Sequence, residues 1–159
     1  MKHTSLVIAI VMFAAAGATP AAQAPATAQA SDAAQRARVA RLPAAVRATV
    51  EMESKGATIR GVSSEKANGK TVYELETLVN GRSRDLMIDA AGKVYLIEEQ
   101  LDIAKAPAPV RAAMEAKGKV VVLESVMQGG KTTYEGQVQT KAGKKMAVEL
   151  DADGKPIKR

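Results

Sequence analysis

Residues 69–74 read Gly-Lys-Thr-Val-Tyr-Glu, and residues 130–135 read Gly-Lys-Thr-Thr-Tyr-Glu. Three other stretches recur in the same order: Val-Arg-Ala at 46–48 and 110–112, Met-Glu-x-Lys-Gly at 52–56 and 114–118, and Asp-Ala-x-Gly-Lys at 89–93 and 151–155. Ordered matches at a nearly constant spacing of about 60 residues indicate a duplicated unit with small insertions. The sequence therefore predicts two tandem repeats, residues 41–104 and residues 105–159.

Each predicted repeat opens with an amphipathic helix. Pro43 suits the first turn of a helix, where its missing N–H is no loss. Gly56 is expected to end that helix, because glycine is common just past a helix C-terminus. In the second repeat the same pattern starts at Pro107 or Pro109 and stops at Gly118.

Short turns divide the rest of each repeat into strands. Asn68-Gly69 and Asn80-Gly81 are pairs preferred in two-residue hairpin turns, whose central positions both need positive φ. A longer turn follows at 89–92, so strands are predicted near 57–66, 71–79, 82–89 and 93–99. The second repeat has its turns at 129–130, 142–143 and 151–154. Connections this short allow only antiparallel neighbours, so each sheet is predicted to be a meander.

Alternation along the strands predicts which side chains face the helix. These positions are Tyr73, Leu75, Thr77, Val79, Leu86 and Ile88 in the first repeat, and Tyr134, Gly136, Val138, Thr140, Met146, Val148 and Leu150 in the second. A helix with one apolar stripe on a sheet with one apolar face is an α+β fold. We therefore expect two tandem repeats, each one helix packed on a four-stranded antiparallel meander sheet. The continuous apolar run at 120–123 leaves its strand central, buried on both sides, or bulged.

The N-terminus has the features of a secretion signal. Lys2 precedes an apolar run at 6–16, and Ala-Gly-Ala at 16–18 fits a small-x-small cleavage site. The run is shorter than the ~20 residues of a membrane span, and no Cys follows it to carry a lipid. We expect residues 1–18 to be a cleaved signal peptide, with no stable membrane anchor afterwards and a periplasmic or secreted mature chain.

Residues 19–40 are predicted to be an Ala/Pro-rich tether followed by a short helix. The stretch up to about residue 30 has no charge and no large apolar side chain, which is typical of a flexible linker. Ser31 or Asp32 could then cap a short helix that runs through Arg41. Gln35 would complete a capping box with Asp32.

The composition argues against an enzyme. The chain has no Cys, and its single histidine, His3, lies in the predicted signal. Catalytic systems based on Ser-His or Cys-His, and the usual ligands of zinc, copper and haem, are thereby absent. We predict no catalytic residues, no cofactor and no metal site. The Asp151-Ala152-Asp153-Gly154 segment reads as a hairpin turn rather than a calcium loop.

The charge does not indicate nucleic-acid binding. The net charge of +6 is spread along the chain, and the predicted mature protein has only three aromatic residues, Tyr73, Tyr95 and Tyr134. Binding of nucleic acid would call for a basic stripe interleaved with stacking aromatics. The acids Glu98, Glu99 and Asp102 are predicted to form a solvated strand end.

Several of these features resemble those of a known family. Leu-Pro-Ala-Ala-Val at 42–46, the Gly-Lys-Thr-Val-Tyr-Glu strand and the closing Asp-x-x-Gly-Lys turn resemble the PepSY-like domains, which are similar to the bacterial beta-lactamase inhibitory protein. The resemblance covers residues 42–100 and 107–159. It implies small exported helix-plus-sheet modules, often in tandem, with binding or inhibitory roles. The inhibitory protein relies on disulfides and an aromatic-rich face, whereas this chain has no Cys and no Trp.

The outward face of the first sheet is the predicted binding site. It carries Val72, Glu74, Glu76, Leu78 and Met87, whereas the second repeat is polar at the matching positions of the same strand. An apolar surface on one copy suggests that it is covered, either by the other repeat or by a partner. We expect an envelope protein or peptide to bind this face or a free strand edge. The alternative is a structural, self-associating module in which the face forms a homodimer.

Overall fold

The computed structural model describes residues 26–157 and contains three α-helices packed on one antiparallel sheet. The helices are α1 (Ala26–Ala40), α2 (Ala44–Glu53) and α3 (Ala108–Glu115), and a short 3-10 helix, η1, spans Ile103–Lys105. The predicted α+β class is confirmed. The predicted signal peptide at 1–18 lies outside the described residues.

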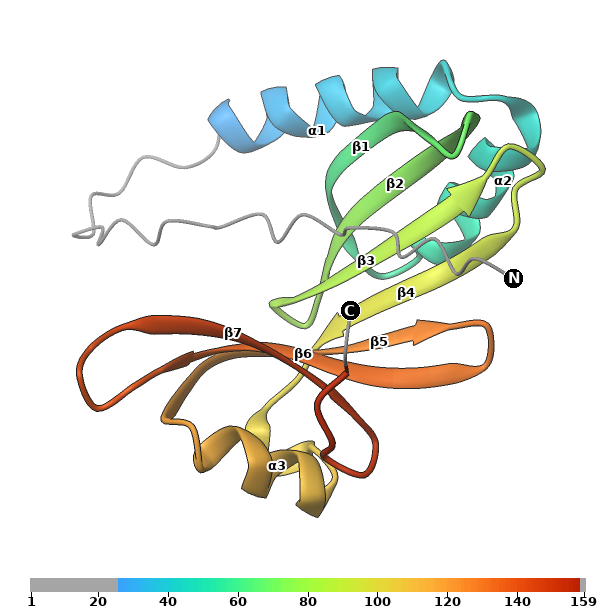
Figure 1. Ribbon diagram of the computed structural model, residues 1–159. Helices are drawn as coiled ribbons and strands as arrows, with labels where there is room; N and C mark the ends of the chain where they lie inside the picture. Colours follow the sequence, from blue (N-terminus) through green and yellow to red (C-terminus); the bar gives the residue numbers. More distant parts are fainter. Residues whose placement is uncertain (1–25, 158–159) are drawn as a thin grey trace.

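Seven strands follow one another across the sheet in chain order (Figure 1). They are β1 (Thr58–Ala67), β2 (Lys70–Val79), β3 (Arg82–Asp89), β4 (Val94–Gln100), β5 (Lys119–Gln128), β6 (Lys131–Gln139) and β7 (Lys145–Asp151). Every neighbouring pair is antiparallel. The predicted strand boundaries in the first half are therefore correct within about two residues.

The prediction of two separate four-stranded sheets is wrong. β4 pairs with β5 over five residue pairs, so the two halves form one continuous seven-stranded sheet. The second half has three strands instead of four. A single bridge between Leu150 and Pro156 stands where the first half has the Ile88–Val94 pair that begins β4. The described chain ends at Ile157, directly after this bridge.

The predicted hairpin turns are confirmed by the backbone. Asn68 and Gly69 have φ of 52° and 76°, and Asn80 and Gly81 have φ of 52° and 78°. Positive φ at both central positions is the geometry of a type I′ turn, which matches the right-handed twist of the strands that it joins. The turn between β2 and β3 therefore fixes their register, with Val79 opposite Arg82.

Each half buries its own apolar core between its helix and one face of the sheet. Val46 and Val50 of α2 are fully buried, and Val110 and Met114 of α3 are likewise. The strand residues of the first core are Val62, Leu75, Leu86 and Ile88, and those of the second are Leu123, Val138, Val148 and Leu150. The predicted inward positions in the middle of the strands are thus confirmed. Met146 is an exception, because it is 37% exposed.

The N-terminal helix α1 differs from its prediction. It begins at Ala26, so residues 26–30 are helical although their composition predicted a tether. The Gln35 side chain does not complete a capping box with Asp32. Its Nε2 donates to the carbonyl oxygen of Arg60 on β1 at 2.9 Å. Val39 joins the first core, so tertiary contacts hold a helix whose sequence alone is a weak helix signal.

The apolar run at 120–123 turns out to be both central and bulged. β5 pairs with β4 on one side and with β6 on the other. Its register with β6 shifts between Val120 and Val122, and Val121, at the bulge, is 46% exposed. A classic bulge places two residues opposite one, which explains how three consecutive valines fit a strand of alternating faces.

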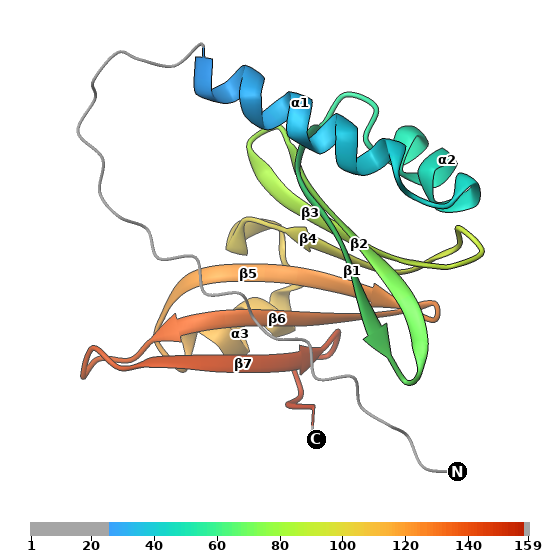
Figure 2. The same cartoon turned by 90° about the horizontal axis from the view of Figure 1, so that it is seen from above.

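The sheet bends between β4 and β5, and the helices lie on the outer sides of the bend (Figures 1 and 2). The opposite face of the sheet is on the inner side, and no helix within residues 26–157 covers it. We call it the open face. The charged and large apolar residues that the strand register places on it include Glu65, Lys70, Val72, Glu74, Glu76, Leu78, Asp85, Met87, Asp89, Leu96, Glu98, Glu124, Val126, Lys131, Glu135, Lys145, Glu149 and Asp151.

Candidate binding face

The open face carries two rows of carboxylates. In the first row Glu76 lies directly opposite Asp85, and Asp85 lies directly opposite Glu98 on the next strand. In the second row Glu124 lies opposite Glu135, which lies opposite Glu149. Side chains at directly opposed positions have Cβ atoms about 5 Å apart. Each row therefore places three acidic groups on three neighbouring strands, β2–β4 and β5–β7.

The structure places the predicted site residues on this face with different degrees of exposure. Glu74, Glu76, Leu78 and Met87 are half-buried. Val72 is only 6% exposed, so its side chain offers little surface to a partner. All five side chains come from β2 and β3, as predicted. Their role in binding stays a prediction.

Sequence reasoning missed the acidic groups that continue the face. Asp85, Glu98, Glu124 and Glu149 were not predicted to join it. Asp85 could have been predicted from the Asn80-Gly81 turn, because a two-residue turn at that place puts Asp85 opposite Glu76. The position of Glu98 beside β5 depends on the contact between the two halves.

The acids at 98–102, predicted to form a solvated strand end, differ in exposure. Glu99 and Asp102 are exposed, whereas Glu98 is half-buried on the open face of β4, an inner strand of the sheet. Glu99 faces the helices and accepts from Nε of Arg84 at 2.9 Å. Asp102 caps η1 by accepting from the N–H of Ala104 at 3.4 Å.

Arg84 of β3 forms ion pairs with α2 and with β4 on the helix-covered face. Its Nη2 donates to Oε2 of Glu53 at 2.9 Å, while its Nε donates to Glu99. The Arg84 and Glu53 side chains are 20% and 24% exposed, so this pair is partly shielded from water. The hydroxyl of Thr77 donates to the Arg84 carbonyl oxygen. This network links α2 to the β3–β4 hairpin, whose other face carries Asp85 and Glu98 of the first carboxylate row.

Burial and mutual repulsion raise the pKa values of the open-face carboxyl groups. Burial raises the pKa of Asp85 to about 6, against its hydrogen bond from the Thr77 N–H, and nearby Glu76 adds to the rise. The pKa of Glu98 is raised to about 7, first by burial and then by Glu124. The pKa values of Glu74 and Glu124 are also raised, mainly by burial.

One oxygen on the face has no hydrogen-bond partner. Glu98 Oε1 is inaccessible to solvent and accepts no hydrogen bond in the structure. A carboxylate oxygen buried without a donor is costly when it is charged, which agrees with the direction of the pKa of Glu98.

The arrangement of the carboxylates does not match a metal centre. Among residues 26–157, no three acidic or histidine side chains converge closely enough to hold a metal ion. The Asp151 Oδ1 atom accepts from the backbone N–H groups of Asp153 and Lys155 at 3.0 and 2.9 Å. That carboxylate thus caps a turn, in agreement with the hairpin interpretation.

No protein-family model matches the sequence. The chain is 31% identical over 109 residues to the Uncharacterized protein YkoJ of Bacillus subtilis (strain 168). That match covers 64% of this chain and 64% of the relative, so the chain spans less than two thirds of the relative's length. Within residues 26–157, no helix is both long and apolar enough to cross a membrane.

Solved structures with the same fold come from Bacteroides species. A BLIP-like protein from Bacteroides fragilis NCTC 9343 superposes with a TM-score of 0.54 at 19% identity, over 74% of this chain and 84% of that one. A DUF2874 family protein from Bacteroides ovatus ATCC 8483 gives 0.57 at 17% identity, over 74% and 85%. A protein from Bacteroides eggerthii DSM 20697, proposed to be periplasmic, gives 0.59 at 15% identity, over 74% and 86%. The chain therefore has the fold of the BLIP-like and DUF2874 proteins.

Proposed function

We propose that this protein is an exported, non-enzymatic binding module of the PepSY-like type, built from two tandem units, whose open face binds another envelope protein or a peptide. The observation that carries this proposal is the uncovered inner side of the bent sheet. It extends across β2–β7 and combines half-buried side chains, among them Leu78, Met87 and Glu98, with the buried Val72, Leu96 and Val126.

The composition of the open face suits a protein partner. Leu78, opposite Ser83, and Met87, opposite Glu74, supply apolar surface at two places on the face, and the Glu76–Asp85 pair lies between them. Interfaces between proteins combine apolar contacts with polar ones. A partner that covers this stretch would therefore bury both apolar side chains and meet the carboxylates between them.

Equivalent environments in the two halves support the tandem PepSY-like reading. Tyr73 lies opposite Ile88 and packs against the first core, while Tyr134 lies opposite Leu150 and packs against the second. Both tyrosines belong to the repeated Gly-Lys-Thr-x-Tyr-Glu stretch. A duplicated unit is the simplest source of such paired environments.

Export is supported by the predicted signal peptide at 1–18 and by the proposed periplasmic location of the Bacteroides eggerthii protein. A non-enzymatic role is supported by the composition, because nucleophile systems that depend on His or Cys have no residues to use after His3.

Affinity capture from an envelope extract, followed by binding measurements with the purified partner, tests the proposal. We expect Leu78→Glu and Met87→Glu to weaken capture strongly, because each would replace an apolar contact of the interface with a charge. Met52→Glu is the matched control, since Met52 is 57% exposed on α2, on the other side of the sheet. A partner that is lost only with Met52→Glu would refute the open face as the binding site.

Sedimentation of the same variants tests the homodimer alternative. A stable dimer of the wild-type protein that dissociates on Leu78→Glu or Met87→Glu would show that the open face is a contact between copies. A monomer in all three proteins, together with capture that depends on the face, supports the proposed function.

A further inference from the structure

The two halves can be compared at one corner of the fold, where a turn joins the second and third strands of each half. The strand registers make Met146 the counterpart of Arg84, and Lys144, two residues earlier, the counterpart of Arg82. In the first half both arginines form ion pairs with acidic side chains, at 2.9 Å for Arg84 and 3.6 Å for Arg82. The cations at the first corner are thus paired within the protein.

The same corner of the second half carries lysines without such partners. They lie in residues 117–119 and 141–145, and neither segment contains an acidic residue. All five are exposed, and none takes part in an ion pair in the part of the chain that the structure describes. Glu115 is the nearest acid along the chain, so positive charge remains in excess. We call these lysines the basic corner: Lys117, Lys119, Lys141, Lys144 and Lys145.

The backbone holds the two lysine segments side by side. Lys119 of β5 lies opposite Gln139 of β6, and Gln139 lies opposite Lys145 of β7. Two strand spacings, about 10 Å, therefore separate the backbones of the two lysines. Gly118 packs so closely on the start of the β6–β7 turn that a Cβ there would collide with the carbonyl oxygen of Gln139. The five charges thus form one patch at this end of the sheet.

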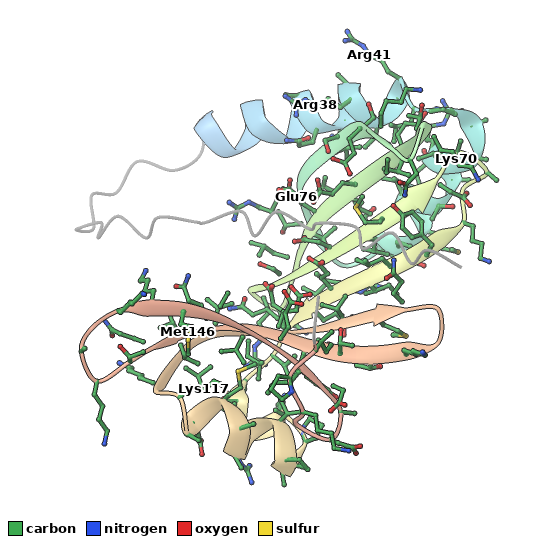
Figure 3. The ribbon with its side chains drawn as sticks, viewed as in Figure 1. Arg38, Arg41, Lys70, Glu76, Lys117 and Met146 are labelled. Carbon is green, nitrogen blue, oxygen red and sulfur yellow. The ribbon has the colours of Figure 1, made fainter. Side chains whose placement is uncertain are left out.

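Exposed aliphatic side chains accompany these lysines. Met146 is 37% exposed, and Val121 and Val122, at the bulge of β5, are 46% and 36% exposed. Figure 3 shows Met146 at the same end of the second half as Lys117. A surface that offers lysines and aliphatic side chains together fits a partner that is anionic at its surface and apolar just beneath it.

A bilayer of anionic phospholipids has this combination of properties. Its headgroup phosphates attract lysines, and its acyl chains accept aliphatic side chains that pass the headgroup layer. A nucleic acid fits less well, because surfaces that bind it combine cations with stacking aromatic rings. Residues 117–122 and 139–147 contain no aromatic residue.

We propose that the basic corner docks reversibly on the surface of an anionic phospholipid bilayer. The lysine ammonium groups contact lipid phosphates, while Met146 and Val121 enter the headgroup layer. This inference goes beyond the proposed function, because it uses residues other than those predicted to bind an envelope protein. It gives the protein a second contact, with the membrane rather than with its partner.

Flotation of the protein with phospholipid vesicles tests the proposal. The vesicles contain phosphatidylcholine with about one third phosphatidylglycerol, or phosphatidylcholine alone. The exported form of the protein is used, because the apolar run at 6–16 would itself bind lipid. We expect binding to the anionic vesicles that weakens as salt is added, and much weaker binding to the neutral ones.

Removal of three lysines should abolish most of this binding. Lys141→Gln/Lys144→Gln/Lys145→Gln should bind the anionic vesicles about 100-fold more weakly, because each lysine near such a surface strengthens binding about fivefold. Thermal denaturation verifies that the variant is folded, as expected for exposed positions.

The matched control removes the same charge from another part of the molecule. Arg36, Arg38 and Arg41 are exposed at α1, which packs on β1 in the first half. Arg36→Gln/Arg38→Gln/Arg41→Gln should weaken vesicle binding less than about threefold, since charges away from the contact are screened by salt. Equal losses in the two triple variants would refute the proposal, because they would indicate attraction set by net charge alone.

A variant that keeps every charge separates a bilayer from a soluble polyanion. Met146→Gln should weaken vesicle binding about fivefold, because an apolar contact with lipid is lost, and should leave binding of inorganic polyphosphate unchanged. Vesicle binding that is indifferent to Met146→Gln, with tight lysine-dependent binding of polyphosphate, would overturn the bilayer as the occupant. Absence of vesicle binding at low salt would overturn the whole inference. Binding of a purified partner through Leu78 and Met87 involves no lipid, so these failures leave the proposed function to its own test.

Discussion

Asp85 on β3 lies directly opposite Glu98 on β4, and both carboxyl groups are half-buried on the same face of the sheet. Burial and the nearby acids raise their pKa values to about 6 and about 7. Two acids held opposite each other in this way oppose each other's ionisation. The protonation of Asp85 and Glu98 therefore makes the stability of the sheet depend on pH.

Stability should decrease as the pH rises from about 5 to about 8. Asp85 and Glu98 have folded-state pKa values above their ordinary values of 3.8 and 4.5. The folded state thus binds more protons than the unfolded state in this window. The stabilisation is fully present below the ordinary pKa values and is lost as the pH passes through about 6 and about 7. Thermal melts followed by circular dichroism at constant ionic strength measure this loss of stability. A Tm that is higher at pH about 8 than at pH about 5 would contradict the prediction.

Replacement of Glu98 by Gln should stabilise the protein at a pH of about 8. The amide keeps the shape of the side chain and removes the charge that Glu124 and Asp85 oppose. After allowance for solvent screening at a partly exposed site, we expect a gain of about 1 kcal/mol, or a few degrees in Tm. Glu51→Gln on the exposed side of α2 serves as the control. A loss of stability in Glu98→Gln at this pH would show that the carboxylate has a favourable partner.

Loss of the Arg84 network should destabilise the protein by about 1–2 kcal/mol. Arg84→Met would leave the half-buried Glu53 carboxylate without the guanidinium that lies 2.9 Å away. Arg82→Met is the matched control, since its pair with Asp102 is longer, at 3.6 Å, and more exposed. Exposed pairs contribute between 0 and about 1 kcal/mol. Urea denaturation of the two variants gives the difference, and equal effects would rule out a special role of Arg84.

Gly92→Ala should cost clearly more stability than Gly69→Ala. Both glycines have positive φ, 83° and 76°, so both substitutions strain the backbone by about 1 kcal/mol or more. A Cβ at position 92 would also lie 2.7 Å from the carbonyl oxygen of Ala45 in α2, whereas nothing lies within 4 Å of one at position 69. Chemical denaturation compares them. Similar losses would mean that the turn after β3 can move away from the helix.

The same reasoning applies to Gly154, whose turn closes on the second helix. A Cβ there would lie 2.5 Å from the carbonyl oxygen of Pro109. Gly154→Ala should therefore be as costly as Gly92→Ala, with Gly130→Ala as the open control at φ of 76°. Unequal costs for Gly92 and Gly154, measured in the same way, would show that the two turn–helix contacts are not equivalent.

Local signals predicted much of the molecule. The Asn-Gly pairs fixed the hairpins, Pro43 marked the start of α2, and the alternation around Leu75 identified the buried face. The helix ends at Glu53, three residues before the predicted stop at Gly56. These features are encoded by a few neighbouring residues, because they depend on backbone conformation and on a period of two along a strand. The helical start at Ala26 was not predicted, since tertiary contacts stabilise α1.

The candidate site was predictable only in part. Glu74, Glu76, Leu78 and Met87 could be placed from strand alternation. Glu98 could not be placed in this way. β4 has an extra residue between Val94, which pairs with Ile88, and Leu96, which pairs with Met87, and this bulge turns the later side chains of β4 to the other face.

By itself, the sequence determined the elements of this protein, their order and the buried side of each strand, because those depend on turn chemistry and on local apolar periodicity. The tertiary structure alone decided that β4 pairs with β5, and so joined two meanders into one bent sheet. That pairing brings together Glu98 and Glu124, which are 26 positions apart and separated by α3. Edge strands pair through backbone hydrogen bonds, which leave no pattern in the side chains. The continuous open face could therefore be recognised only from the tertiary structure.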